Sequence, residues 1–85
     1  MKVVVRMFGA YADLMPERML ELEVAGDRIA DLRVALGEVL AQRWPDFQAG
    51  LLRYSAFADE HTVLRDGEPL PADGRVAILP PVSGG

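Results

Sequence analysis

The chain lacks cysteine, has a single histidine, and carries fewer basic than acidic residues. Without cysteine it cannot form disulfides or thiolate metal sites, and it cannot store sulfur on a side-chain thiol. Nine basic residues against thirteen acidic ones give a net charge of −4, which is the wrong sign for a protein that binds nucleic acid through its phosphates. No cluster of carboxylates at metal-ligand spacing surrounds His61, and we expect no metal site there.

Long apolar runs are also missing. No stretch approaches the roughly 18 apolar residues of a membrane-spanning helix, and the start, MKVVVRMF, is too short and too interrupted for a signal peptide. We therefore expect a cytoplasmic protein with no membrane partner. The 85 residues suffice for one small domain with a single core, and so short a chain leaves little room for an enclosed active site.

Two N-terminal segments alternate apolar with polar residues, which is typical of half-buried strands. Residues 1–8 have one wholly apolar face, made of Val3, Val5 and Met7. Their other face carries the charged Lys2 and Arg6 together with Phe8. Residues 19–24 repeat the pattern, with an apolar face made of Leu20, Leu22 and Val24. We expect both apolar faces to contact one core.

A helix is predicted over residues 29–44. Its apolar side chains follow helical spacing at Ile29, Leu32, Leu36, Val39 and Leu40. Asp27 is placed to cap the first turn, where Asp31 would favour the positive end of the helix dipole. Pro45 is expected to end the helix.

Several short strands are predicted after this helix. One lies within residues 51–58, another covers 62–64, and a last one covers 75–79 before two prolines. This order is that of a β-grasp, an α+β roll in which a mixed sheet of about four to five strands wraps one long helix. We expect a β-grasp domain over residues 1–79, with the first and last strands parallel neighbours, followed by a flexible tail over residues 80–85.

The tail, PPVSGG, carries no charged side chain. Its prolines favour an extended backbone and resist joining a sheet, so it could reach about 20 Å from the domain. Gly84 and Gly85 lack a Cβ atom and could pass a narrow channel into another protein's active site. There the Gly85 carboxylate could attack ATP, and sulfide could displace AMP from the acyl adenylate. The simpler alternative is a frayed end or a cloning remnant.

The closing residues 72–85, ADGRVAILPPVSGG, together with the order of elements, resemble the MoaD/ThiS-like family of ubiquitin-like sulfur carriers. Within that family they are most similar to small subunits of molybdopterin synthase, which end in an Asp-Gly turn, an apolar strand and PPVSGG or PPVTGG. Phe8 followed by Gly9 is similar to the end of the family's first strand. The chain departs from the pattern at Ala12, Asp13 and Ala58.

The resemblance implies a noncatalytic carrier that binds no cofactor itself. Gly85 would be adenylated by an E1-like enzyme that uses ATP and magnesium, and a desulfurase or rhodanese would supply sulfur for a terminal thiocarboxylate. The carrier would join the large, catalytic subunit of molybdopterin synthase in a heterotetramer and donate sulfur to cyclic pyranopterin monophosphate. The tail inserted in the large subunit would consist of Pro80, Pro81, Val82, Ser83, Gly84 and Gly85.

Strand alternation makes a separate prediction about Phe8 and Leu79. If Val76 and Ile78 face the core, Leu79 points outward and lies beside Phe8 as an exposed apolar patch next to the tail. In the family the matching positions contact the large subunit and the E1-like enzyme, so we expect a partner interface with Lys2 and Arg6 as its polar rim. The alternative is a satellite core.

Other functions stay open at this point. The chain could carry sulfur for cysteine, thiamine or transfer RNA thiolation, although PPVSGG disfavours thiamine. It could also be a protein modifier that Gly85 joins to lysines, or a binding module with an incidental tail. Two acidic pairs, Glu21/Glu23 and Asp59/Glu60, are expected to aid solubility rather than catalysis.

Overall fold

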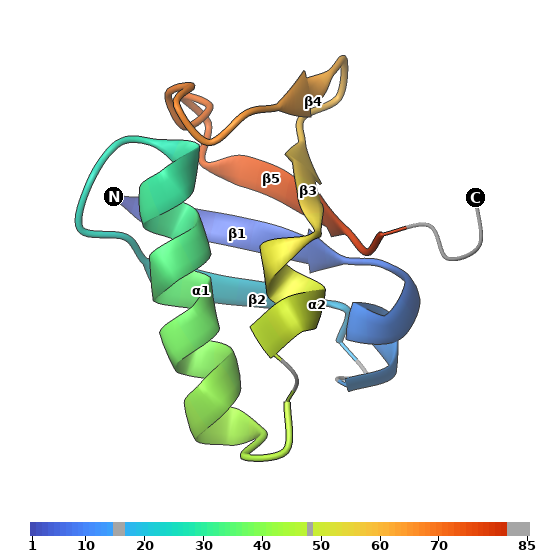
Figure 1. Ribbon diagram of the computed structural model, residues 1–85. Coiled ribbons are helices and arrows are strands. Elements are labelled where there is room, and N and C mark those ends of the chain that lie inside the picture. Colours follow the sequence, from blue (N-terminus) through green and yellow to red (C-terminus); the bar gives the residue numbers. More distant parts are fainter. Residues whose placement is uncertain (15–16, 48, 82–85) are drawn as a thin grey trace.

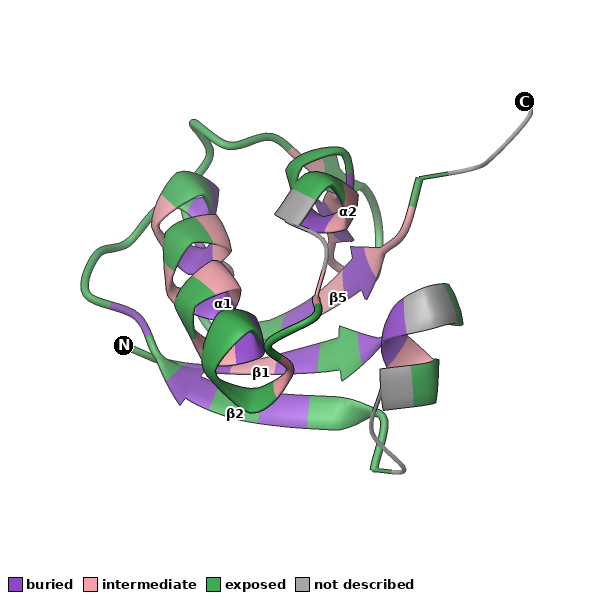
Figure 2. Ribbon diagram, turned by 60° about the horizontal axis from the view of Figure 1, so that its bottom comes forward, coloured by how far each residue is buried: buried purple, intermediate pink, exposed green. Residues whose placement is uncertain are grey.

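The structure, a computed structural model, describes residues 1–14, 17–47 and 49–81. One layer is a five-stranded sheet, and helix α1 (Ile29–Arg43) lies across one of its faces (Figures 1 and 2). The strands are β1 (Lys2–Met7), β2 (Met19–Glu23), β3 (Ala56–Ala58), β4 (Val63–Leu64) and β5 (Arg75–Leu79). In the described part of the chain, no helix is both long and apolar enough to cross a membrane.

The sheet has the order β2-β1-β5-β3-β4. Its central strands, β1 and β5, are parallel and place Val5 opposite Val76 and Met7 opposite Ile78. The flanking pairs are antiparallel, with β2 beside β1 and β3 between β5 and β4. A mixed sheet with parallel first and last strands beneath one long helix is a β-grasp, so the predicted fold class is confirmed.

The core lies between α1 and the sheet. The helix contributes a buried stripe made of Ile29, Leu32, Leu36 and Leu40. The central strands contribute Val3, Val5, Met7, Val76 and Ile78. Burial of one such side chain contributes roughly 1.5–3 kcal/mol, so the alternation that defines these faces also stabilises the roll. The predicted core faces of the first, second and last strands are confirmed.

The start of α1 differs from the prediction. Arg28, not Asp27, occupies the cap position, and its backbone N–H donates to the carboxylate of Asp31 at 3.1 Å. The backbone carbonyl of Asp27 instead accepts a hydrogen bond from the N–H of Leu70 at 2.7 Å. The turn before the helix is thus tied to the connection between β4 and β5, a contact that local sequence does not reveal.

A second helix, α2 (Ala49–Arg53), precedes β3 and was not predicted. Arg33 of α1 holds this region in place. Its Nη1 donates to the backbone carbonyls of Leu52 at 2.7 Å and Ser55 at 2.9 Å, and its Nη2 donates to the carboxylate of Asp66 at 2.8 Å. One side chain therefore joins α1 to the end of α2 and to the turn after β4.

The connection from β1 to β2 contains a 3-10 helix, Gly9–Leu14, that was also not predicted. Within it Tyr11 is fully buried, and its hydroxyl lies 2.6 Å from Oγ of Ser55. Because the Ser55 hydroxyl donates to the carbonyl of Leu51, the Tyr11 hydroxyl is the donor to Ser55. The connection is therefore anchored to the segment between α2 and β3.

Candidate partner interface

Within residues 1–14, 17–47 and 49–81, no helix lies on the sheet face opposite α1, and β1 and β5 lie near the middle of that face (Figure 2). On β1, Arg6 is exposed and Val4 is half-buried. On β5, Arg75 is exposed and Ala77 is half-buried. Since successive strand residues point to opposite faces, these side chains alternate with the core residues of the same two strands. We call this surface the open face.

Phe8 and Leu79 lie where β1 and β5 end. The pairing of Met7 with Ile78 brings the next two residues, Phe8 and Leu79, to the same level of the parallel strands. Phe8 is 42% exposed and Leu79 is half-buried. Both alternate with core residues as predicted, but only Phe8 is exposed, so the predicted exposed patch of the two side chains is confirmed for Phe8 alone. Their contact with a partner stays a prediction.

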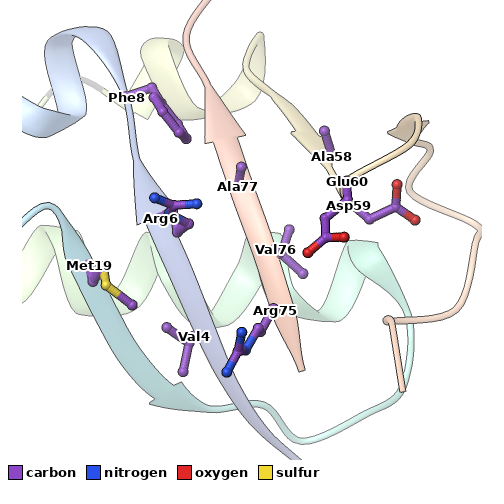
Figure 3. Close-up of a pocket in the computed structure, with 10 residues that line it drawn as sticks. All are labelled: Val4, Arg6, Phe8, Met19, Ala58, Asp59, Glu60, Arg75, Val76 and Ala77. Atoms are coloured by element: carbon purple, nitrogen blue, oxygen red, sulfur yellow. The ribbon is translucent and has the colours of Figure 1, made fainter. Parts of the chain in front are cut away.

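A hollow of about 530 Å³ lies on the open face and is bordered by Phe8 (Figure 3). Its apolar lining consists of Val4, Phe8, Met19, Ala58 and Ala77. Arg6 and Arg75 bring positive charge to it. A second hollow of about 360 Å³ lies on the other side of Phe8 and is lined by Gly9, Ala12 and Arg18, among others. Phe8 therefore separates two depressions, a position suited to an apolar anchor in a complex.

Positively and negatively charged side chains lie on different parts of the open face. The Arg6 guanidinium lies 5.9 Å from the centre of the Phe8 ring, within cation–π range. On the β3 side, the hollow is bordered by Asp59 and Glu60 (Figure 3). The backbone N–H groups of His61 and Thr62 donate to the Asp59 carboxylate at 2.8 Å, and these hydrogen bonds lower the pKa of Asp59. The hollow thus has arginines on β1 and β5 and the carboxylates of Asp59 and Glu60 on its β3 side.

The predicted rim residue Lys2 forms an ion pair with Glu21 across β1 and β2, with Nζ and Oε1 3.2 Å apart. Both side chains are exposed, so the pair contributes little to stability. Arg6 lies closer to Phe8 and lines both hollows. Of the two predicted rim residues, Arg6 is therefore the one that the fold places at the candidate interface.

The tail begins at this site. Pro80 is half-buried and Pro81 is exposed, whereas Val82, Ser83, Gly84 and Gly85 lie outside the described residues. The predicted reacting group, the carboxylate of Gly85, is among the latter. Within the described ranges, no group of three His, Cys, Asp or Glu side chains could hold a metal ion. The described part of the site therefore consists of the open face with its two hollows and the first two residues of the tail.

Three features of the site were not found from the sequence. Met19 lies two residues before Glu21 on β2, so the two side chains point to the same face of the sheet. This alternation could have placed Met19 on the open face. Gly9 and Tyr11 had no comparable signal, because their surroundings come from distant segments. Two of the positions that depart from the family pattern, Ala58 and Ala12, line the first and second hollow respectively.

No family model matches the chain. A curated protein of Synechococcus elongatus, the molybdopterin synthase sulfur carrier subunit, is 38% identical over 82 residues, which cover 92% of this chain and 90% of the relative. The crystal structure of SAMP1 from Haloferax volcanii matches with a TM-score of 0.70 and 22% identity, over 100% of both chains. At that identity the second likeness concerns the fold alone, and it agrees with a β-grasp.

Proposed function

The chain belongs to the family of molybdopterin synthase sulfur carrier subunits, and from that premise we propose that Gly85 carries sulfur as a terminal thiocarboxylate. An E1-like enzyme binds ATP and magnesium, and the Gly85 carboxylate attacks the α-phosphate with loss of pyrophosphate. Sulfide, derived from a desulfurase or rhodanese, then displaces AMP from the acyl adenylate. The thiocarboxylate sulfur bonds to cyclic pyranopterin monophosphate, and water then cleaves the bond between that sulfur and the Gly85 carbonyl carbon. The sulfur stays on the pterin, and the carrier is released with its carboxylate restored.

The observation that supports this proposal is that the described start of the tail, Pro80 and Pro81, follows β5 at the end of the sheet where Phe8 follows β1. Residues 80–85 follow β5, which lies at the centre of the sheet beside β1. A protein docked on Phe8 and Leu79 would therefore be adjacent to the start of the segment that ends in Gly85. Association and delivery of the carboxylate use one surface, which favours reaction by holding the reacting groups together.

The docking surface has a chemistry that defines its partners. Phe8, Met19 and Ala77 provide apolar contact, and Arg6 and Arg75 provide positive charge. A partner segment with apolar side chains flanked by carboxylates would match this surface. We assign it to the large subunit and to the E1-like enzyme, which would bind in turn because both need the same carboxylate. Catalysis lies on those partners, the assembly with the large subunit is a heterotetramer, and the reactions take place in the cytoplasm.

Intact mass spectrometry tests the carrier chemistry. The chain is incubated with its E1-like enzyme, ATP, magnesium and sulfide, and the large subunit with the pterin precursor is then added. We expect a mass gain equal to the replacement of one oxygen by sulfur, which disappears as the dithiolene forms. A gain that persists would contradict the assignment of the acceptor and indicate another pathway. Absence of any gain, or conjugates on lysines, would contradict the carrier proposal.

A variant that lacks Gly84 and Gly85 is the matched control. Every buried apolar side chain of the described core lies between Val3 and Ile78, so we expect the free energy of unfolding to stay unchanged. Sulfur transfer should be abolished, because the terminal carboxylate no longer reaches the activating site. Transfer at the full rate by this variant would exclude Gly85 as the carrier residue, and loss of folding would show that the tail belongs to the domain.

A further inference from the structure

Gly9 and Pro80 meet where the β1–β2 connection passes the end of β5. A Cβ atom added to Gly9 would lie 2.6 Å from Cγ and 3.4 Å from Cδ of Pro80. The first distance is shorter than a carbon–carbon contact can be, so any side chain at position 9 would push the proline ring away. Gly9 also has φ +57, a conformation that glycine adopts at no steric cost. Close approach and backbone conformation both require glycine here.

The segment that carries Gly9 is held by the fold. Tyr11, two residues later, is fully buried and hydrogen-bonded to Ser55, and its backbone N–H donates to the carbonyl of Phe8 at 3.2 Å. The N–H of Met7 donates to the carbonyl of Arg18 at 2.8 Å. The segment from Met7 to Tyr11 is therefore held in place by these contacts, and we call it the support. Because Gly9 belongs to it, the support is not expected to move aside when a side chain at position 9 meets Pro80.

Pro80 is held from its own side as well. It follows β5, in which Ile78 is fully buried, and its ring fixes φ near −65°. The contact with Gly9 thus joins two held segments and limits the directions in which the chain can continue beyond Pro80. Phe8 belongs to the same support, so the direction is set relative to the docking surface.

We propose that Gly9 is a positioning residue that, through its contact with Pro80, sets the direction in which the C-terminal segment leaves the domain relative to Phe8. The inference rests on the proposed function, since direction matters only if Gly85 must reach a partner's reaction centre. Once the open face has docked, a misdirected segment would place the carboxylate away from its target. Small displacements of reacting groups lower rates on the order of 100-fold while leaving docking affinity intact.

Substitution by asparagine separates the Cβ contact from the backbone conformation. Asparagine tolerates positive φ better than other side chains, so Gly9→Asn adds the Cβ at a small conformational cost. Gly67→Asn is the control, because a Cβ atom at Gly67 meets nothing within 4 Å. Pro80→Ala removes Cγ and Cδ, the two atoms nearest to the added Cβ. In a double-mutant cycle, Gly9→Asn should raise the unfolding equilibrium constant in both backgrounds. We expect the increase to be smaller by a factor of about two or more when Pro80 is replaced by alanine.

Two further measurements test direction itself. Because the chain has no cysteine, spin labels can be attached at Ser83→Cys and at Glu38→Cys on α1. We expect Gly9→Asn to shift or broaden the distance distribution between the labels, and Gly67→Asn to leave it unchanged. In the E1-dependent reaction, Gly9→Asn should lower kcat about 10- to 100-fold with the dissociation constant unchanged.

Identical distance distributions for the two asparagine variants overturn the proposal, whatever the stability cycle gives. A change in the dissociation constant without a change in kcat also overturns it, because docking would then be the step affected. If the proposed function is wrong, the unsubstituted chain will show no mass gain from sulfur, and this result is distinct from the two above. In that case the label distances still decide whether Gly9 directs the C-terminal segment.

Discussion

Met7 and Phe8 are adjacent, large and apolar, yet Met7 is 2% exposed and Phe8 is 42% exposed. The same contrast occurs at the end of β5, where Ile78 is fully buried and Leu79 is only half-buried. Met7 and Ile78 belong to the buried core, and their burial is favourable because it removes apolar surface from water. Folding alone does not account for Phe8 and Leu79. Phe8 is an exposed apolar side chain next to the half-buried Leu79, and we predict that a partner protein covers them.

Arg33 on the covered side of the sheet and Arg6 on the open face also differ in whether they contact the rest of the chain. Arg33, on the covered side, donates to the carbonyls of Leu52 and Ser55 and to the carboxylate of Asp66, so its hydrogen bonds serve the fold. Arg6, on the open face, is exposed and lies over the Phe8 ring. On the covered side, polar and apolar groups contact other parts of the chain, whereas Arg6 and Phe8 on the open face stay exposed.

The largest expected effect on stability comes from the covered side. Met7→Ala removes a buried side chain and leaves a cavity, so we expect the free energy of unfolding to fall by about 2–5 kcal/mol. Met19→Ala is the matched control, because Met19 is 50% exposed on the open face and its loss should change stability by less than about 1 kcal/mol. Urea denaturation of both variants measures the difference. Equal losses would show that the two faces do not differ in their contribution to folding.

A substitution next to Met7 should act on binding instead. Phe8→Ala removes the apolar side chain between the two hollows, and we expect the affinity for the large subunit to fall about tenfold or more. Stability should change by less than about 1 kcal/mol, since Phe8 is exposed. Val34→Ala, on the outer side of α1 and 64% exposed, should leave affinity unchanged. Calorimetric titration of both variants compares them, and an unchanged affinity for Phe8→Ala would remove Phe8 from the interface.

Alternation along strands explains why the two faces could be predicted from the sequence. Each strand residue faces away from its neighbours, so the inward Val5 and outward Arg6 follow from their positions alone. The 15-residue helix α1 carries enough turns for its apolar spacing to be recognised. The five-residue helix α2 does not, and it lies in a stretch where a strand was the stronger pattern.

Contacts between distant segments could not be predicted in this way. The buried position of Tyr11 depends on Ser55, which is 44 positions away, and the tight packing of Gly9 depends on Pro80 near the other end of the chain. At the start of α1, Arg28 rather than the predicted Asp27 takes the cap position, in a turn that Leu70 holds by a hydrogen bond to the Asp27 carbonyl. For the candidate site, the sequence therefore predicts Phe8 and Leu79 but not the contacts of Gly9 and Tyr11.

Tyr11 is the buried residue of the 3-10 helix that follows Phe8 and begins at Gly9. Removal of its hydroxyl group should have the smallest effect of the three substitutions. Tyr11→Phe loses the hydrogen bond to Ser55, and we expect the free energy of unfolding at neutral pH to fall by about 0.5–1.5 kcal/mol. Tyr54→Phe is the control, since Tyr54 is 71% exposed. Affinity for the large subunit should fall less than in Phe8→Ala, because the Tyr11 ring keeps its place against Phe47.

The pH dependence of that loss identifies Tyr11 as its source. Burial raises the pKa of Tyr11 above its usual value of 10.0, against the opposing effect of the Arg33 charge. The folded state therefore holds the phenolic proton more tightly than the unfolded state does. The resulting stabilisation is complete below pH 10.0 and is lost as the pH rises through the raised pKa. Urea denaturation on both sides of that pH should show the stabilities of wild type and Tyr11→Phe converging in the alkaline range. A constant gap would mean that Tyr11 has the same pKa in the folded and the unfolded chain, and a widening gap would mean that folding lowers it. Either result would contradict the burial of the Tyr11 hydroxyl beside Ser55.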